Sequence, residues 1–293
     1  MAANAESTSP AVAFRAATPS DYNAFASLYV EFGARESAPG PEHFVQRIAP
    51  WTVIAESADR AALGFITSSI WGDLLRIEYL VVAPEARGSG LSVRLVERAL
   101  HEARRTGGVA RVELTVMPHN ERAIALYERL GLERDYPVLV MHVDEEAIAR
   151  LAPPPRPIRV LYDRAADPPR TDASLALPPG TIEAGLQYGY SVIALDDGGA
   201  IVGAVVFDPN HERMSRFAVA SAEFLRPLLE AVSNAREAAA AVPCASGLEL
   251  TIEGFADVQK TLLAAGAVVS LELVAMNGAL DVAIERARTF GAA

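Results

Sequence analysis

Two spacings of hydrophobic residues divide the first half of the chain into strands and helices. Short alternating or continuous apolar runs predict strands, and apolar positions three and four residues apart predict helices. The predicted strands are residues 12–16, 51–56, 62–70, 76–82, 110–116 and 137–143. The predicted helices are residues 20–32, with Ser20 as the N-cap, 41–48, 91–105 and 121–130. The resulting order, βααβββαβαβ, is typical of an α/β domain.

A proline-rich stretch at residues 152–157, APPPRP, separates this half from the next, because proline lacks an amide donor and has a fixed φ angle. The sequence therefore predicts two domains, residues 1–151 and 158–293, joined by a linker at 152–157. The second half repeats the later elements of the first in the same order, which predicts a domain duplication. These are a hairpin at 191–208 around Asp197-Gly198-Gly199, a strand at 216–220, a helix at 223–241, a strand at 248–252, a helix at 257–265 and a strand at 268–276.

Length and composition agree with two folded domains. The chain has 293 residues, and its 51% hydrophobic and 22% charged residues exclude global disorder. The net charge of −11 is spread over both halves, which disfavours nucleic acid as a partner. No apolar run has the length of a membrane helix and the N-terminal residues lack an export signal, so we expect a soluble, cytoplasmic protein without a membrane partner. Cys244 is the only cysteine, so we expect neither a disulfide within the chain nor a metal site.

The segment from Arg76 to Ser92, RIEYLVVAPEARGSGLS, has the order strand, glycine loop, helix. Glycines allow several backbone amides to converge, and the first turn of a helix adds unpaired donors and the positive end of its dipole. Arg87 adds a full positive charge. We interpret this segment as an anion site of a size suited to pyrophosphate, with an ordinary strand-to-helix turn as the alternative. It is neither a P-loop nor a dinucleotide fingerprint.

A second segment, Met117 to Leu132, reads MPHNERAIALYERLGL. Asn120 is placed to cap a helix, and Tyr127 follows two turns later on roughly the same face. Together the VAPEARGSG loop and the NERAIALYERLGL helix resemble the GNAT superfamily of acyl-coenzyme A dependent N-acyltransferases. The resemblance covers roughly residues 12–143 and implies two tandem GNAT-like domains, each a twisted, mostly antiparallel sheet flanked by helices in a mixed α/β fold.

The resemblance also implies which groups would hold coenzyme A. The strand before the loop and the strand at 111–116 would splay apart, so that the backbone of Leu80 and Val82 pairs with the pantetheine arm. Asn120 would contact the coenzyme, act only as a helix cap, or do both. Ser92 stands where the family usually has Gly or Ala, and this departure would lower the affinity for coenzyme A if the hydroxyl does not fit. The pyrophosphate would lie on the amides of Arg87, Gly88, Ser89, Gly90, Leu91 and Ser92.

Two residues match catalytic positions of the family. Tyr127 corresponds to the tyrosine that protonates the leaving thiolate, and a phenol with its ordinary pKa of about 10 is protonated at neutral pH. The alternative is a partly buried aromatic residue with a bonded hydroxyl. Glu78 corresponds to the glutamate that takes a proton from the amine, with a surface or salt-bridged carboxylate as the alternative. Tyr79, next to it, is expected on the opposite face.

The second half departs from the family pattern at both places. After its strand RFAVA comes SAEFLRPLLE without a glycine loop, and its last helix has neither the Asn nor the Tyr. We therefore expect a degenerate GNAT-like domain that has lost coenzyme binding. It could cover the edge of the first sheet, shape the acceptor pocket or mediate a homodimer.

The expected activity is transfer of an acetyl group from acetyl-CoA to a primary amine, on a small molecule or a peptide amino terminus, by direct attack in a ternary complex. Direct attack is favoured over an acyl-enzyme because Cys244 lies in the degenerate half and no Ser or Cys with a partnered base is evident. The alternative is a non-catalytic acyl-CoA sensor or a scaffold.

Overall fold

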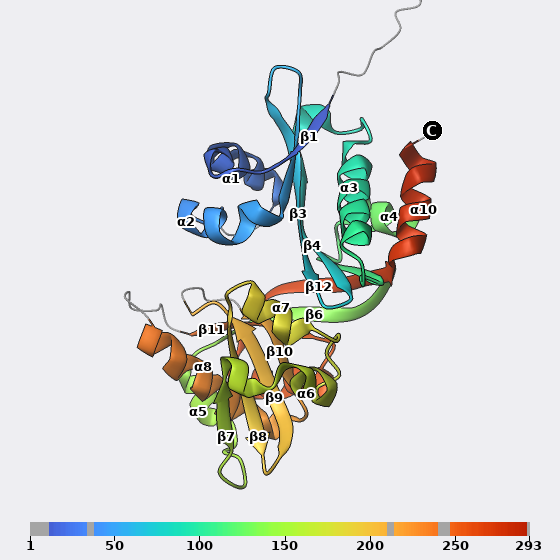
Figure 1. The fold of residues 1–293 in the computed structure, drawn as a ribbon. Coiled ribbons are helices and arrows are strands. Elements are labelled where there is room, and N and C mark those ends of the chain that lie inside the picture. The colour runs from blue at the N-terminus through green and yellow to red at the C-terminus, as the bar shows by residue number, and fades with distance from the viewer. Residues whose placement is uncertain (1–11, 34–37, 210–213, 240–246, 292–293) are drawn as a thin grey trace, which may run out of the picture.

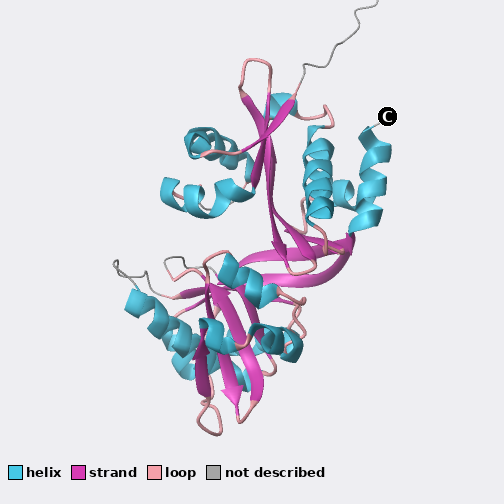
Figure 2. Ribbon diagram, viewed as in Figure 1, coloured by secondary structure: helices cyan, strands magenta, loops and turns pink. Residues whose placement is uncertain are grey.

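Two sheets with helices on both faces make up the protein in the computed structural model (Figures 1 and 2). The structure describes residues 12–33, 38–209, 214–239 and 247–291. We call the part built around strands β1–β5 the first unit and the part built around β7–β11 the second unit. This arrangement confirms the predicted mixed α/β fold.

The larger sheet has the strand order β1-β2-β3-β4-β5-β12-β6-β11. Neighbouring strands are antiparallel except β4 and β5, which are parallel. Its strands are β1 (Ala13–Ala16), β2 (Thr52–Glu56), β3 (Ala62–Trp71), β4 (Leu74–Val82), β5 (Arg111–Val116), β6 (Glu133–Val143), β11 (Leu248–Glu253) and β12 (Val268–Ala279).

Helices cover both faces of this sheet in the first unit (Figure 1). On one face lie α1 (Tyr22–Tyr29) and α2 (Pro41–His43), which continues as the π-helical turn Phe44–Ile48. Here the ring of Phe25 packs 4.7 Å from that of Phe44 and 4.9 Å from that of Phe65. On the other face lie α3 (Leu91–Thr106), α4 (Glu121–Arg129) and α10 (Leu280–Gly291).

The last strand and helix of the chain complete the first unit. β12 lies between β5 and β6, with Ala279 paired to Arg111 on one side and Val268 paired to His142 on the other. α10 then packs beside α3 (Figure 1), and the buried residues Leu280 and Ile284 join the core of the first unit. The first unit therefore depends on residues from the far end of the sequence.

The second unit contains a four-stranded antiparallel sheet, β10-β9-β8-β7. Its strands are β7 (Arg159–Tyr162), β8 (Ser191–Asp197), β9 (Ala200–Phe207) and β10 (Met214–Val219). Successive residues of β8 face two different cores, which places helices on both faces. One face carries α6 (Pro168–Ser174) and α7 (Thr181–Gln187), and the other carries α5 (Glu145–Arg150), α8 (Leu225–Ala239) and α9 (Ala256–Ala265).

All predicted strands and helices are present, with ends displaced by a few residues, and residues 240–241 of the predicted helix 223–241 lie outside the described residues. The Ser20 cap is wrong, because the amide and hydroxyl of Thr18 bind the carboxylate of Asp21 instead, each at 2.7 Å. The hydrophobic pattern did not predict β7, α5, α6, α7 or α10. Short 3₁₀ turns complete the described chain at Pro19–Asp21, Val30–Phe32, Ala49–Trp51, Pro84–Ala86, Asp163–Ala166 and Ala222–Phe224.

The second unit docks on the turn between β3 and β4. Gly72 in this turn lies so close to the second unit that a Cβ atom would come within 1.9 Å of the carbonyl oxygen of Pro179. The amide of Ile70 donates to the hydroxyl of Tyr188 at 2.9 Å, and Arg47 donates to the carbonyl of Gly189 at 3.0 Å. These contacts bring side chains of the second unit next to the first unit's sheet.

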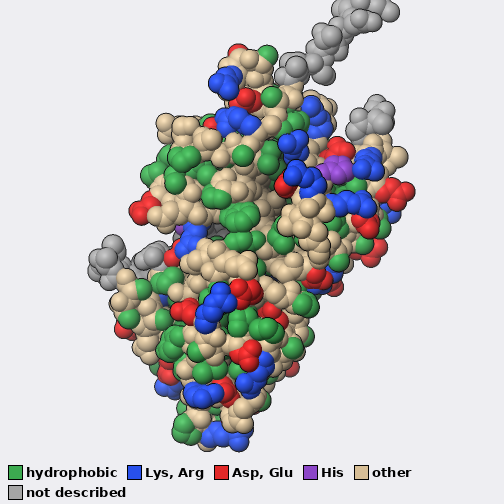
Figure 3. Space-filling model, viewed as in Figure 1, with side chains coloured by type: hydrophobic (Ala, Val, Ile, Leu, Met, Phe, Trp, Pro, Cys, Tyr) green, Lys and Arg blue, Asp and Glu red, His purple; other side chains and the backbone are tan. Residues whose placement is uncertain are grey.

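On the face shown in Figure 3, acidic and basic side chains lie among one another over most of the surface. This agrees with the even spread of charge along the sequence. Among the described helices, none combines the length and the apolar character needed to cross a membrane.

Candidate functional site

The glycine loop connects β4 to α3. β4 ends at Val82, a 3₁₀ turn follows at Pro84–Ala86, and α3 begins at Leu91. Gly88 and Gly90 have φ angles of +83° and +78°, a region that favours glycine. A Cβ atom on either one would meet nothing within 4 Å, so the backbone conformation and not crowding requires glycine here.

The amides of this loop form the most distinctive feature of the site. Within the described chain, the backbone amides from Gly88 to Val93 have no intramolecular acceptor, and the first helical hydrogen bond runs from the amide of Arg94 to the carbonyl of Gly90 at 3.2 Å. The amide of Arg87, which we had expected to join them, donates to the carbonyl of Pro84 at 3.2 Å. Six consecutive donors at the positive end of a helix are an arrangement suited to an anion.

The guanidinium of Arg87 already has partners. Its Nη2 lies 2.5 Å from Oε2 of Glu31, and its Nε donates to the carbonyl of Val82 at 3.2 Å. The hydroxyl of Ser89 donates to the carbonyl of Ala86 at 2.7 Å, which fixes the loop from within. An anion on the loop would therefore compete with Glu31 for Arg87 but not for the six amides.

β4 and β5 separate in front of this loop. They pair in parallel from Leu74 and Arg111 as far as Ile77 and Leu114, and no pairing between them continues beyond. Leu80 and Val82 pair with β3 only, through Ile66 and Gly64. The predicted splay of the two strands is confirmed, and it leaves one edge of β4 unpaired between Glu78 and Val82 within the described chain.

A β-bulge lies at the point of separation. On the neighbouring strand β3, Thr67 pairs with Tyr79 and Ser68 pairs with Ile77. Glu78 of β4 therefore has no paired residue on β3 and forms the bulge. A bulge reverses the alternation of side chains along the strand. Tyr79 consequently packs against Tyr29 and Phe32, with ring centroids 5.5 and 5.3 Å apart, on the α1 face of the sheet. Glu78 binds Ser69 on this same face, so the prediction that Tyr79 lies on the opposite face was wrong.

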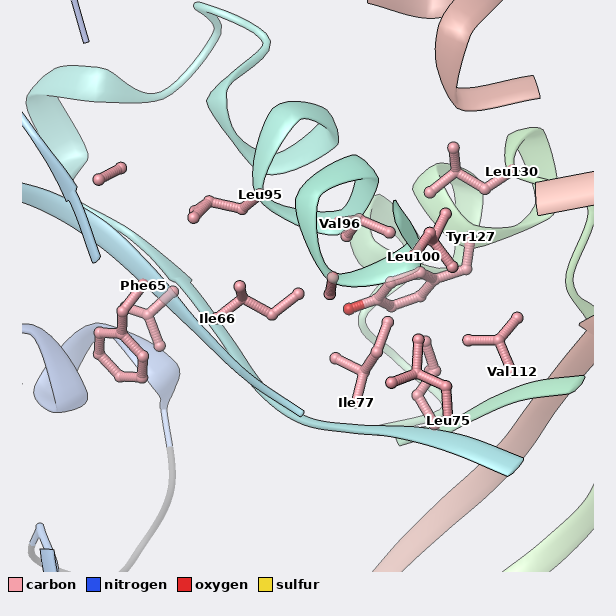
Figure 4. Close-up of a cluster of buried hydrophobic side chains, with 14 of the residues drawn as sticks. Phe65, Ile66, Leu75, Ile77, Leu95, Val96, Leu100, Val112, Tyr127 and Leu130 are labelled. Atoms are coloured by element: carbon pink, nitrogen blue, oxygen red, sulfur yellow. The ribbon is translucent and has the colours of Figure 1, made fainter. Parts of the chain in front are cut away.

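Tyr127 lies between α4 and the sheet, at the base of the gap. Asn120 caps the start of α4, and the left-handed Gly131 ends it, which fixes the orientation of the helix. Figure 4 shows the Tyr127 ring among Leu100, Leu75 and Val112, with its hydroxyl pointing toward the strands that carry Ile66 and Ile77.

The surroundings of Tyr127 are apolar. The residue is 6% exposed, and its hydroxyl has no hydrogen-bond partner among the described residues. Burial raises the pKa of Tyr127 well above its ordinary value of 10.0. The prediction of an ordinary pKa was therefore wrong, while the phenol remains protonated at neutral pH.

Asn120 acts as the helix cap that the sequence predicted. Its Oδ1 accepts from the amide of Ala123 at 3.1 Å, and the residue is exposed at the N-terminal end of α4. Its contact with coenzyme A stays a prediction.

Glu78 lies on the opposite face of the sheet from Tyr127. Its Oε1 accepts from the hydroxyl of Ser69 at 3.0 Å, and its Oε2 lies 3.5 Å from Nε of Arg76. The side chain of Glu78 is 35% exposed, so it can still reach a solute. Ile77 faces Tyr127, and the adjacent Glu78 points to the other face of the sheet. Tyr127 and Glu78 can therefore act on the same bound molecule only if it lies in the gap between β4 and β5.

Sequence analysis missed the residues that hold Glu78. Ser69 and Arg76 lie on strands that were predicted from their apolar residues, so these two polar side chains had no assigned role. The available signal was a pair of charged residues two positions apart in β4, Arg76 and Glu78, because this spacing places both on one face of a strand.

The second unit differs at the corresponding place. After β10, the 3₁₀ turn Ala222–Phe224 leads directly into α8, and the amide of Phe224 donates to the carbonyl of Ser221. No residue of this connection has a positive φ angle. Cys244 lies outside the described residues.

The chain is similar to known acetyltransferases in sequence and fold. Residues 22–132 match the model of the acetyltransferase (GNAT) family. A GCN5-related N-acetyltransferase from Sphaerobacter thermophilus has 18% identity over 92% of this chain and 96% of its own, with a TM-score of 0.61. A putative acetyltransferase from Pyrococcus horikoshii has 14% identity over 92% and 89%, with a TM-score of 0.60.

A tandem GNAT protein from the clavulanic acid biosynthesis pathway has 16% identity over 92% of this chain and 99% of its own, with a TM-score of 0.58. The fold of the whole chain is thus similar to that of a tandem GNAT protein, and the match to the acetyltransferase (GNAT) family model lies at residues 22–132.

Proposed function

We propose that the protein transfers an acetyl group from acetyl-CoA to a primary amine by direct attack in a ternary complex. The observation that carries this proposal is the row of six free amides from Gly88 to Val93 beside the unpaired edge of β4. The match of residues 22–132 to an acetyltransferase family supports acyl transfer as the reaction.

The residues present fit coenzyme A. Its pyrophosphate carries negative charge and suits the amides of Gly88, Ser89, Gly90, Leu91 and Ser92 at the start of α3. Its pantetheine arm has amide groups, which suit the unpaired backbone of Leu80 and Val82. The carbonyl of Val82 becomes available when Arg87 turns toward the phosphates, and Asn120 lies at the exposed end of α4.

The proposed chemistry uses one proton donor and one proton acceptor. The amine nitrogen forms a bond to the thioester carbonyl carbon, and the carbon–sulfur bond breaks. Glu78 takes the proton that the amine loses, directly or through water, and Tyr127 donates a proton to the departing sulfur. Acceptor and thioester are held together in the gap, where orientation lowers the barrier further.

The acceptor would bind on the face of the sheet that carries Glu78. The acceptor would reach Glu78 from the side of α1 and the second unit, where Ser69 and Arg76 already hold the carboxylate. We propose a small-molecule amine or a peptide amino terminus as acceptor. Residues 1–151 would carry catalysis, and residues 158–293 would not bind coenzyme.

Release of free thiol from acetyl-CoA in the presence of a panel of amines tests this function. We expect thiol release that depends on both substrates, with the rate varying with the size and charge of the amine. Coenzyme binding without turnover against the whole panel would favour an acyl-CoA sensor. If saturating acetyl-CoA does not raise the melting temperature, the scaffold alternative stands instead.

Replacing Gly90 by Val is expected to weaken acetyl-CoA binding about tenfold or more. A β-branched residue at a φ angle of +78° costs roughly 1–2 kcal/mol, and the loop can relieve this strain only by turning its amides away from their common point. Isothermal titration measures the dissociation constant.

The matched control is Gly198→Val, which places the same side chain at a φ angle of +60° in the β8–β9 hairpin, also with nothing within 4 Å of its Cβ atom. This variant should bind acetyl-CoA like the wild type. Equal affinities for the two variants would remove the loop amides from the binding site.

A further inference from the structure

Four charged side chains form a cluster where the two units meet, which we call the interface cluster. Arg76 of β4 and Glu113 of β5 come from the first unit, and Arg216 of β10 and Glu253 of β11 come from the second. Three of these side chains are 8–11% exposed and that of Glu253 is 23% exposed. Buried charges of this kind are retained only with partners, so their contacts are informative.

Arg76 stands at the centre of the cluster. Its Nη1 lies 2.8 Å from Oε1 of Glu113 and 2.9 Å from Oε1 of Glu253, and its Nε lies 3.5 Å from Oε2 of Glu78. One guanidinium is therefore shared among three carboxylates. The longest of the three contacts is the one to Glu78, so it is the first to weaken if another carboxylate draws Arg76 away.

Arg216 is the second cation for the same carboxylates. Its Nη1 lies 3.4 Å from Oε2 of Glu253 and 3.7 Å from Oε1 of Glu113. Burial raises the pKa of Glu253, but attraction to Arg76 and Arg216 outweighs this effect and the pKa is lowered overall. Both arginines therefore favour the ionised form of Glu253.

A second route joins Arg216 to Glu78 through neutral groups. The guanidinium of Arg216 lies 5.3 Å from the ring centre of Trp71. The indole Nε1 of Trp71 donates to the hydroxyl of Ser69 at 2.8 Å, and this hydroxyl donates to Oε1 of Glu78 at 3.0 Å. Each carboxylate oxygen of Glu78 is therefore held by a group that Arg216 helps to place.

Stability alone does not account for Arg216. Its Nε and Nη2 are buried without a hydrogen-bond partner in the described part of the chain, which costs free energy. Buried ion pairs can often be replaced by apolar residues without loss of stability. A residue that is costly for the fold and linked twice to Glu78 suggests a role in the site.

We propose that Arg216 of the second unit is a positioning residue for Glu78. Arg216 balances the charges of Glu253 and Glu113, so that the Nε of Arg76 can remain in contact with Glu78. The second unit thereby completes the acceptor side of the active site. This inference rests on the proposed function, in which Glu78 takes the proton of the amine.

The variant Arg216→Met in the full chain tests this role, because methionine fills similar space without charge. Arg76 should then be drawn to Glu253 and Glu113 and away from Glu78. We expect kcat for the amine to fall about tenfold or more, with the dissociation constant of acetyl-CoA changed less than twofold. The control is Arg159→Met, which removes an exposed arginine of the second unit that binds Asp196. It should leave kcat unchanged.

The double variant Arg216→Met/Glu253→Gln separates positioning from packing. Removing the second charge releases Arg76 from Glu253 and returns it to Glu78, so kcat should recover to within threefold of the wild type. A merely structural role predicts further loss when another buried partner is removed. The double variant is balanced in charge and remains informative if Arg216→Met does not fold.

Two outcomes would overturn the inference: wild-type kcat in folded Arg216→Met, or a double variant as inactive as the single one. Full activity in Glu78→Gln would instead remove the base role that the proposed function gives to Glu78, and the inference with it. A wild type without activity is a further, separate outcome, in which the proposed function itself fails because no thiol is released with any amine.

Discussion

Replacing Ile284 by Asp is expected to abolish acetyl-CoA binding, although Ile284 lies nearly at the end of the chain and far from the loop in sequence. Ile284 is 1% exposed and packs in the core of the first unit through α10 and α3. An unpaired charge buried there costs roughly 3–5 kcal/mol, a large part of the total stability of an ordinary domain. The loop amides lie at the first turn of α3, so loss of this packing disorders the site.

Thermal unfolding and acetyl-CoA titration measure the two effects. The control Val282→Asp places the same carboxylate on the same helix at a side chain that is 40% exposed. Its effect should stay within about 0.5 kcal/mol, as is usual for surface substitutions. If Ile284→Asp bound acetyl-CoA with a wild-type melting temperature, α10 would not be part of the first unit's core.

Replacing Tyr127 by Phe is expected to lower turnover by about 10²-fold or more, the usual range for a lost general acid. The hydroxyl has no intramolecular partner among the described residues, so its removal breaks no hydrogen bond of the fold. The melting temperature and the dissociation constant of acetyl-CoA should therefore stay near those of the wild type. Steady-state thiol release and titration provide both numbers.

Tyr22→Phe is the matched control, since Tyr22 packs against Phe44 on the other face of the sheet. Turnover should not change in this variant. Because burial raises the pKa of Tyr127, we also expect no alkaline loss of wild-type turnover from its ionisation below about pH 10. Identical turnover in Tyr127→Phe and Tyr22→Phe would end the acid role.

Local features of the fold could be predicted from the sequence because their signals lie within a few residues. The glycines at positions 88 and 90 occupy left-handed conformations, and Asn120 caps α4 as expected. Alternation of side chains likewise predicted the strands. In each case the residues that define the structure are close neighbours in the chain.

The pairing of distant strands could not be predicted in this way. β12 has the same apolar pattern whether it follows β11 in a second sheet or lies between β5 and β6. Packing against distant residues decides between these positions. The order of elements therefore revealed the duplication without revealing that the large sheet joins the two units.

The partners of Glu78 were hidden for a related reason. Arg216 and Glu253 are charged residues in strands of the second half, where a charge normally faces solvent. Their burial follows from the docking of the second unit on β3 and β4. The apolar surroundings of Tyr127 are also a product of packing, which explains why its raised pKa was not foreseen.

The position of β12 has a consequence for synthesis of the protein. β5 emerges from the ribosome well before β12, and domains usually begin to fold from the N-terminus. Until the final strand arrives, β5 has an unpaired edge, which is a template for aggregation. A nascent chain therefore cannot finish its first unit before β12 and α10 have been synthesised, and a chain that stops between β11 and β12 lacks part of the first unit's sheet and core.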